Sequence, residues 1–231
     1  MIDRYSISAP AEQIMSRFGA DVPQHYQPRY NAAPTQLLPV ITAEGARGVS
    51  TFYWGRPPAM SANRALGEKL INTRLETLME RPALAANLLK KRCIIPADGF
   101  FGWKKTGKKT AIPYRFVVQT GIFSMAGIWE EFETDDGETV HTFSVITMPA
   151  NKLVEPVCPR MPVILDAKSE SIWLADTGDM VLLMGQLVAW PPEQMNLFTV
   201  SPRIADPGAN HPSLIVPMPA ADQHGNLTLF D

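Results

Sequence analysis

The stretch Arg92-Cys93-Ile94-Ile95-Pro96-Ala97-Asp98-Gly99-Phe100-Phe101-Gly102-Trp103 decides the fold of this 231-residue chain. β-Branched and aromatic residues dominate it, which predicts a strand over residues 93–103. A lysine-rich run at 104–109 follows around Gly107 and is typical of a hairpin tip, with the return strand expected at 114–118. We therefore expect the centre of the chain to be a β-hairpin with an apolar body and a basic end.

Strand and helix patterns alternate along the rest of the chain. Apolar runs predict strands at 36–42, 49–54, 70–74, 122–129, 140–147, 162–165 and 197–201, with turns at Glu44-Gly45 and around 135–137. Helices are expected at 10–18, 75–91, 169–175 and 180–187, with Ser8 capping the first, Gly19 ending it and Pro82 breaking the second. This mixed order favours an α+β fold. We expect one domain over residues 1–231, with a loosely ordered tail from about residue 217.

The composition is that of an ordinary globular protein. Hydrophobic residues make up 45% and charged residues 19%, and the 21 prolines favour turns and edge strands over a helical bundle. The N-terminus lacks a positively charged start followed by an apolar segment, and the apolar run 180–190 is too short to cross a bilayer. The two cysteines make neither a disulfide framework nor a four-ligand metal site, and free thiols suit a reducing compartment. We expect a cytoplasmic monomer without membrane contact.

The charge is unevenly distributed along the chain. The net charge is −2, which by itself gives no indication of a nucleic-acid partner. Residues 56–109 nevertheless carry twelve Lys/Arg against four Asp/Glu, a net of +8, whereas the remainder is −10. A basic segment of this kind is typical of phosphate contact, but the same lysines also suit a solvated helix end and hairpin tip.

Residue spacing alone supports little enzymatic chemistry. The four histidines are scattered, without a second ligand at helical or hairpin spacing, so we expect neither a metal nor another cofactor. Cys93 lies in an apolar run, which favours a buried and inert thiol. Cys158 lies close to Arg160, which leaves open a thiol hydrolase or peptidase that uses Cys158 with His141 or His211 as its base.

Several strings across most of the chain resemble one protein family. They lie at 29–35, 54–55, 71–77, 92–103, 143–147, 160–165 and 200–201, in the order and spacing of the SRAP family (SOS-response-associated peptidase, abasic-site processing). The resemblance implies a compact α+β domain of curved antiparallel sheets flanked by helices, with a groove for single-stranded DNA. It also implies a role in the DNA damage response, in which the protein is crosslinked to DNA at an abasic site.

The resemblance implies a specific chemistry at the N-terminus. In the family, the initiator Met is removed and a Cys becomes the first residue. Its α-amine condenses with the aldehyde of the opened abasic sugar, and its thiol then closes a stable thiazolidine ring. An Asn places the terminus and the sugar, and it matches Asn72 here, while a Glu and a His handle protons.

This chain departs from that chemistry at three positions. Ile2 stands where the family has the Cys, Gly102 where it has the Glu, and Cys158 where it has the His, and Asp3 also replaces a Gly. A bulky second residue hinders removal of Met1, whose α-amine, with an ordinary pKa of about 7.7–8.0, can form a reversible imine but no thiazolidine. We therefore expect the permanent covalent reaction to be lost.

The residues that match the family's DNA-binding groove are better retained than the reactive residues. The expected partner is single-stranded or abasic DNA. Arginines would contact phosphates, and Trp103 would stack a base at about 1–3 kcal/mol. The alternative is a non-catalytic interaction module whose arginines pair with Glu76 or Asp98. Where some family members carry adjacent tryptophans, this chain has the sequence of residues 56–60. By resemblance, the groove residues are Arg4, Asn31, Pro34, Asn72, Arg74, Trp103, Thr147 and Arg160.

Overall fold

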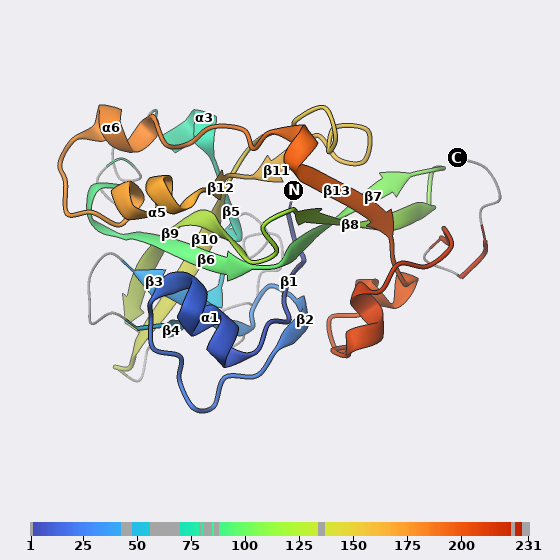
Figure 1. Ribbon diagram of the computed structural model, residues 1–231, viewed down its shortest axis with the longest axis horizontal. Coiled ribbons are helices and arrows are strands. Elements are labelled where there is room, and N and C mark those ends of the chain that lie inside the picture. Colours follow the sequence, from blue (N-terminus) through green and yellow to red (C-terminus); the bar gives the residue numbers. More distant parts are fainter. Residues whose placement is uncertain are drawn as a thin grey trace.

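Two β-sheets carry the fold in the computed structural model (Figure 1). The structure describes residues 2–42, 48–55, 70–78, 80, 85, 88–133, 137–222 and 225–227. The larger sheet has the strand order β11-β10-β4-β3-β6-β9-β12, with β5 beside β10. Because β9 also pairs with β10, the strands β10, β4, β3, β6 and β9 close into a barrel-like ring. These strands are β3 (Leu37–Thr42), β4 (Ser50–Trp54), β5 (Asn72–Arg74), β6 (Arg92–Ala97), β9 (Phe123–Glu133), β10 (Thr139–Pro149), β11 (Arg160–Pro162) and β12 (Ile164–Leu165).

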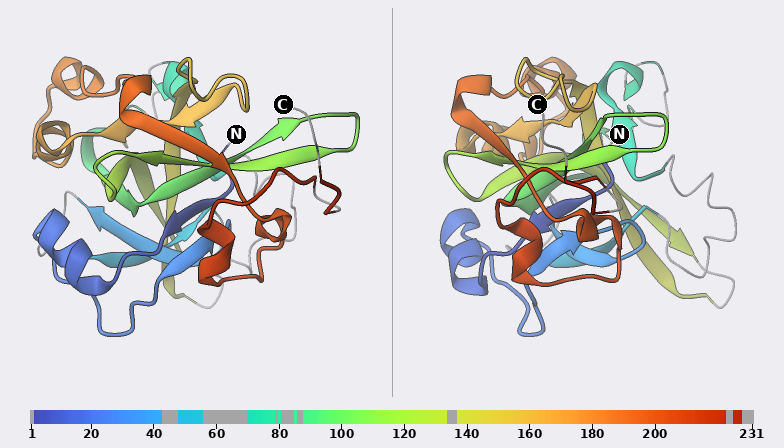
Figure 2. Two further views of the ribbon diagram at one scale, coloured as in Figure 1. Left: turned by 45° about the vertical axis from the view of Figure 1, so that its right-hand side comes forward. Right: turned by 90° about the vertical axis from the view of Figure 1, so that its right-hand side faces the viewer.

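The smaller sheet has five strands in the order β13-β8-β7-β1-β2 and is antiparallel throughout. The larger sheet is mixed, because β4 and β5 both run parallel to β10. Figure 2 shows the β7–β8 hairpin extending away from the rest of the molecule. The strands of this sheet are β1 (Tyr5–Ile7), β2 (Arg29–Ala32), β7 (Gly99–Lys105), β8 (Ala111–Val118) and β13 (Met195–Thr199).

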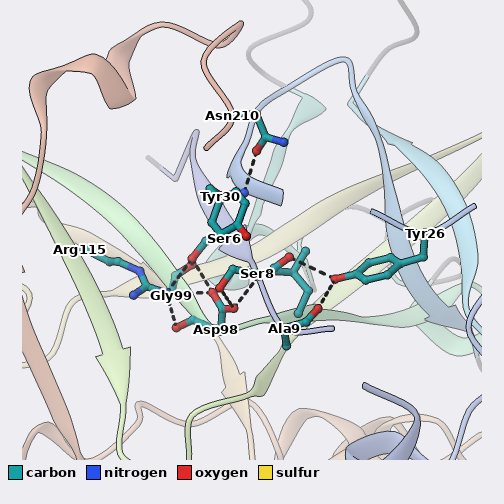
Figure 3. Close-up of polar contacts among 10 residues, drawn as sticks. Ser6, Ser8, Ala9, Tyr26, Tyr30, Asp98, Gly99, Arg115 and Asn210 are labelled. Carbon is teal, nitrogen blue, oxygen red and sulfur yellow. Dashed lines mark hydrogen bonds and ion pairs between the residues drawn. The ribbon is translucent and has the colours of Figure 1, made fainter. Parts of the chain in front are cut away.

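The predicted single strand over residues 93–103 is wrong, because the chain changes sheets at Asp98. The segment before Asp98 forms β6 in the larger sheet, and the segment after it forms β7 in the smaller sheet. The Asp98 carboxylate accepts hydrogen bonds from Ser6 Oγ (2.6 Å), Ser8 N (2.5 Å), Ser8 Oγ (2.6 Å) and Arg115 Nη2 (2.9 Å) (Figure 3). Tertiary hydrogen bonds that no local pattern reveals therefore set this break.

Gly99 allows the Arg115 guanidinium to approach the backbone beside Asp98. A Cβ atom at Gly99 would lie 2.5 Å from Arg115 Nε, so any larger residue there would displace the arginine. Arg115 also donates to Ser6 Oγ at 3.1 Å, which ties β8 to β1 across β7. These contacts anchor the N-terminal strand in the centre of the smaller sheet.

The helices are short and lie where the sequence predicts them, with shifted ends. Gly19 ends the first helix in the left-handed region at φ 60°, as expected, but Ser8 does not cap it: Pro10 holds that position and Ser8 binds Asp98. Asp166 and Asp179 cap two later helices through the backbone amides of Ser169 and Leu182. The helices are α1 (Ala11–Phe18), α3 (Leu75–Leu78), α5 (Ala167–Trp173) and α6 (Met180–Met184), with 3-10 turns η2 (Pro192–Gln194), η3 (Pro202–Ala205) and η4 (Pro212–Ile215).

Other predictions of strands agree with the structure except at 162–165, where Val163 separates β11, which pairs with β10, from β12, which pairs with β9, while some turns fall outside the described residues. The sequence pattern missed β1 and β2, and these strands bring the N-terminus into the smaller sheet. The C-terminal segment is held at Met218, whose N–H donates to Thr199 O at 3.0 Å, and Ala221 and Asp222 beyond it are still buried. The turn at Glu44-Gly45, most of the turn at 135–137, Pro82 and residues 56–60 are not described.

One large apolar core spans both sheets. It contains Ile2, Tyr5 and Trp54 at full burial, together with Phe100 and Phe116 from the central hairpin. A smaller cluster of Phe101, Val200, Ile204 and Leu214 fastens the C-terminal segment to the opposite face of β7. None of the described helices is long and apolar enough to cross a membrane.

Candidate functional site

The N-terminal residues run alongside β7 and bring position 3 next to position 102. Tyr5 pairs with Phe100 and Ser6 with Gly99, and Phe101 N donates to Arg4 O at 3.1 Å, which continues the antiparallel ladder. Extending this register by one residue places Asp3 opposite Gly102. Directly opposite residues share a face of the sheet, so this register places Asp3 and Gly102 on the same face.

Ile2 is held between the core and Asn72. Its side chain is fully buried, and its carbonyl oxygen accepts a hydrogen bond from Asn72 Nδ2 at 2.7 Å. Asn72 is the first residue of β5 and lies opposite Val145 of β10. A side chain of the larger sheet therefore holds the residues that precede β1 of the smaller sheet. The Asn72 Oδ1 atom is buried and has no hydrogen-bond partner within the described part of the chain. Met1, which bears the α-amine, is not among the described residues.

Gly102 and Cys158 are in direct contact. A Cβ atom at position 102 would lie 3.0 Å from Cys158 Sγ and 3.1 Å from Phe116 Cε2, closer than ordinary side-chain packing. The Cys158 side chain is 9% exposed, and its thiol donates to Arg160 O at 3.4 Å. The glycine thus leaves room for the cysteine, and the register that places Asp3 opposite Gly102 brings Ile2 and Asn72 to the next position along the chain.

The environment of Cys158 keeps its thiol protonated. Burial is the largest influence and raises the pKa of the Cys158 thiol, while the positive charge of the N-terminal amine and the hydrogen bond to Arg160 O lower it; the negative charge of Asp3 raises this pKa by the smallest share. Burial also raises the pKa of Cys93, which is fully enclosed, so its interpretation as an inert thiol agrees with its position. Neither cysteine has the low pKa that marks a reactive thiolate.

Two histidines expected as possible bases for Cys158 are engaged with other groups. His141 stacks on Phe52 with ring centroids 4.9 Å apart, and its Nε2 lies 3.5 Å from Glu131 Oε1. His211 Nδ1 lies 2.7 Å from Ser213 Oγ. Among the described residues, no group of three His, Cys, Asp or Glu side chains could hold a metal ion.

Arg74, Thr147 and Arg160 come together on three adjacent strands. Thr147 of β10 is paired with Arg74 of β5 on one side, and it accepts from Arg160 on the other, through its backbone oxygen (2.6 Å) and its hydroxyl (3.2 Å). Arg160 also makes a two-pronged ion pair with Glu76, both distances being 2.8 Å. This pair lowers the pKa of Glu76 to about 2. The alternative that Arg160 pairs with Glu76 is therefore present in the structure, while Arg74 is exposed.

Arg4 contacts the end of η3, and Asn31 contacts the segment that follows it. Arg4 donates to Asp3 O at 2.6 Å and to Ala205 O at 3.4 Å. Asn31 is 1% exposed, and its Nδ2 donates to Asp206 O at 2.8 Å and to Ala209 O at 3.0 Å. Both side chains thus hold the C-terminal segment.

The remaining predicted groove residues differ in exposure. Trp103 and Pro34 are half-buried, and Trp103 packs against the Phe101 cluster. Thr147 is 1% exposed, so its described contacts are to Arg160 and to its neighbouring strands. Within the predicted set, Arg74 has the most open position.

Sequence reasoning missed Asp3 as a member of this site. From the sequence, Asp3 was noted only because it replaces a glycine of the family. The strand register places Asp3 opposite Gly102, and its negative charge contributes to the raised pKa of Cys158. The signal would have been the antiparallel register between the N-terminus and residues 99–102. That register cannot be read from either segment alone.

Comparison with known proteins finds a matching family, relatives and a solved structure over most of the chain. Residues 1–207 match the family model described as SOS response associated peptidase (SRAP). The abasic site processing protein YoqW of Bacillus subtilis is 35% identical over 93% of this chain and 99% of its own length. The abasic site processing protein HMCES of Rattus norvegicus is 25% identical over 84% of this chain and 66% of its own length. A crystal structure of a protein from Bacteroides thetaiotaomicron covers 93% of this chain with a TM-score of 0.81 and 28% identity, and the match takes in 99% of that chain.

Proposed function

Since the chain belongs to the SRAP family, we propose that it binds abasic sites in single-stranded DNA and holds them without a permanent covalent link. The observation that carries this proposal is that Asn72 holds the carbonyl of a buried Ile2, one residue before the position that the strand register places opposite Gly102 and its neighbour Cys158. The frame that positions the N-terminus is retained, with Asn72 bonded to the carbonyl of residue 2. The side chain at position 2 has no thiol with which to close a ring.

The reaction open to this site stops at the imine. The α-amine at the N-terminus adds to the aldehyde of the opened abasic sugar, and the resulting carbinolamine loses water to give a C=N bond. Asp3 is the described carboxylate beside Gly102, where it is suited to accept a proton from nitrogen and return it to the departing hydroxyl. The residue that bears the α-amine has no thiol that could add to the C=N carbon. The imine is therefore hydrolysed back to the amine and the aldehyde.

DNA contacts in this proposal are divided between exposed and supporting residues. Arg74 is exposed and contacts phosphate directly, while Arg160 exchanges its pairing with Glu76 for a phosphate. Thr147 and Asn31 are buried and support these contacts, Thr147 by orienting Arg160 and Asn31 by holding the C-terminal segment beside Arg4. Trp103 and Pro34 are half-buried, and in this proposal Trp103 stacks a base from the face of β7 that packs against the C-terminal segment.

The test mixes the unmodified protein with an oligonucleotide from which uracil has been excised, and separates the products on a denaturing gel. We expect no heat-stable adduct without reductant, and an adduct after borohydride, which reduces the imine to a stable amine. An oligonucleotide with a tetrahydrofuran abasic analogue has no aldehyde and is the matched control. A heat-stable adduct without borohydride would contradict the loss of permanent linkage.

A separate measurement addresses binding itself. Fluorescence anisotropy with single-stranded DNA at low salt should show an affinity that falls as salt rises, because phosphate neutralisation releases counterions. Arg74→Gln should weaken this binding. If the protein has no affinity for single-stranded DNA at low salt, DNA binding is excluded.

A non-catalytic interaction module is the second candidate. The Arg160–Glu76 pair and the hydrogen bonds of Asn31 to Asp206 and Ala209 favour it, because they engage groove residues within the chain. The same anisotropy measurement separates the two, since this candidate requires no affinity for DNA. A thiol hydrolase is disfavoured by the raised pKa of Cys158.

A further inference from the structure

The β7–β8 hairpin carries a concentrated positive charge on its outer half. Lys104, Lys105, Lys108 and Lys109 fall within six residues, and the sequence from Gly99 to Val118 contains no Asp or Glu. The only other cation of the hairpin is Arg115, at its base, which pairs with Asp98. The outer half therefore has no carboxylate of its own hairpin to neutralise it.

The hairpin begins at the candidate site and leads away from it. Gly102, which contacts Cys158, lies on β7 opposite Tyr114, and Lys104 lies opposite Ile112. Residues two apart on a strand share a face, so Lys104 lies on the face of Gly102, about 7 Å further along. From Gly102 to the tip at Gly107 the distance along the strand is about 17 Å. Figure 2 shows this hairpin projecting from the body, with the N-terminus near its base.

The two faces of the hairpin differ in what covers them. On the opposite face, Phe101 and Trp103 pack with Val200, Ile204 and Leu214 of the C-terminal segment. Lys105, two residues beyond Trp103, lies on this opposite face, so beyond the C-terminal segment both faces of the hairpin carry a lysine. Lys105 and Lys108 are exposed and form no ion pair within the described part of the chain. These two like charges repel each other, and a polyanion relieves that repulsion.

We propose that the β7–β8 hairpin is a phosphate-binding arm, along which single-stranded DNA runs on one side of the abasic nucleotide. Lysine ammonium groups are flexible point charges that contact phosphates without selecting a base sequence. The arm therefore increases the affinity for DNA and fixes the 5′-to-3′ direction in which the DNA strand lies, without a preference for any base sequence. This inference rests on the proposed function, because it extends the same DNA path outward from Gly102.

The experiment compares two exposed pairs that carry the same charge. Lys105→Gln/Lys108→Gln alters the arm, while Lys90→Gln/Lys168→Gln removes two charges from exposed positions elsewhere. Binding is measured by anisotropy as a function of salt with two oligonucleotides, one carrying the abasic site near its 5′ end and one near its 3′ end. Thermal unfolding confirms that both variants are folded.

If the hairpin is such an arm, the substitutions should weaken binding to only one of the two oligonucleotides. The Lys105/Lys108 variant should bind one of the two oligonucleotides more weakly, with a salt slope smaller by about 0.7 for each lost phosphate contact. The other oligonucleotide and the Lys90/Lys168 variant should behave like the wild type. An unchanged salt slope with both oligonucleotides would contradict the proposed arm. Equal losses of affinity in the Lys105/Lys108 and Lys90/Lys168 variants would contradict it too, because they would indicate only a general attraction between the protein's positive charge and DNA. Absence of binding by the wild type would instead reject the proposed function.

Discussion

The two ends of the N-terminal strand β1 differ in how their polar groups are satisfied. At the end nearer α1, the Asp98 carboxylate accepts from Ser6, Ser8 and Arg115, and the Tyr26 hydroxyl donates to Ala9 O at 2.8 Å (Figure 3). At the end nearer the terminus, four buried atoms have no hydrogen-bond partner within the described residues. These atoms are Arg4 Nε, Tyr5 Oη, Asn31 Oδ1 and Asn72 Oδ1.

This difference separates an anchor from a binding site. Buried polar groups are normally paired, so a satisfied network fixes a strand, whereas unpaired groups in a natural fold call for an explanation such as an absent ligand. Arg115 Nε is the exception at the anchored end, and it lies where Gly99 leaves room for it. We infer that the Asp98 network holds β1 in register so that the residues before it can meet a ligand.

The largest expected effect tests the anchor. Asp98→Ala removes the carboxylate that pairs with the Arg115 guanidinium. The Arg115 side chain is only 10% exposed, so its charge would remain buried without a partner carboxylate. Breaking a buried ion pair in this way costs about 3–5 kcal/mol of unfolding free energy. Urea denaturation measures the loss, with Glu76→Gln as the control, because that carboxylate is 46% exposed and its pair is worth about 0.2–1 kcal/mol. Equal losses in the two variants would remove the distinction between the ends of β1.

A second prediction concerns the buried residue at the terminus. Ile2→Cys removes carbon atoms from a fully buried side chain, and we expect it to lower the unfolding free energy by about 1–3 kcal/mol. Ile7→Cys, at the equally buried anchored end, is the matched control and should cost a similar amount. Only Ile2→Cys should give a heat-stable adduct with abasic DNA without borohydride. If neither variant does, Gly102 and Cys158 themselves prevent ring closure.

The contact between Gly102 and Cys158 gives a third prediction. Gly102→Ala forces a Cβ atom to within 3.0 Å of Cys158 Sγ, and overpacking of this kind costs about 1–3 kcal/mol. Cys158→Ala removes the sulfur, so the double variant should recover part of that loss in a double-mutant cycle. Gly178→Ala is the control, because a Cβ atom there would meet no described atom within 4 Å beyond its chain neighbours. Strict additivity of the Gly102 and Cys158 changes would show that the two positions are not coupled.

Local patterns predicted most strands, three of the helices and the start of the helix expected at 75–91, because apolar periodicity is a local property. They failed at Asp98, where the break between β6 and β7 depends on Ser6 and Ser8, which are about 90 residues away in the sequence. They also failed at β1 and β2, since short buried strands such as Tyr5–Ile7 carry no alternation that distinguishes them. In each case the missing information was a contact between distant segments.

The site was predictable to the extent that the resemblance placed residues 2, 72, 102 and 158. What the sequence did not reveal was the mutual contact of Gly102 with Cys158, or the position of Asp3 opposite Gly102. It also left open whether Arg160 pairs with Glu76, which the geometry shows. These relations depend on strand register and side-chain direction, and a one-residue slip would reverse them.

The smallest expected effect is a pH dependence at the site end. The pKa of Glu76 falls from 4.5 to about 2 in the folded protein because Arg160 stabilises its charged form. A lowered folded pKa contributes stability above about pH 4.5, and this contribution is lost as the pH falls towards 2. Since the Glu76 side chain is 46% exposed, solvent screening limits the contribution to about 0.2–1 kcal/mol. Wild type should therefore be slightly more stable than Glu76→Gln at pH 7, and the difference in unfolding free energy should shrink between pH 4.5 and 2. A difference that stays constant over that range would show that the ion pair contributes nothing, and that Arg160 is already free to meet a phosphate.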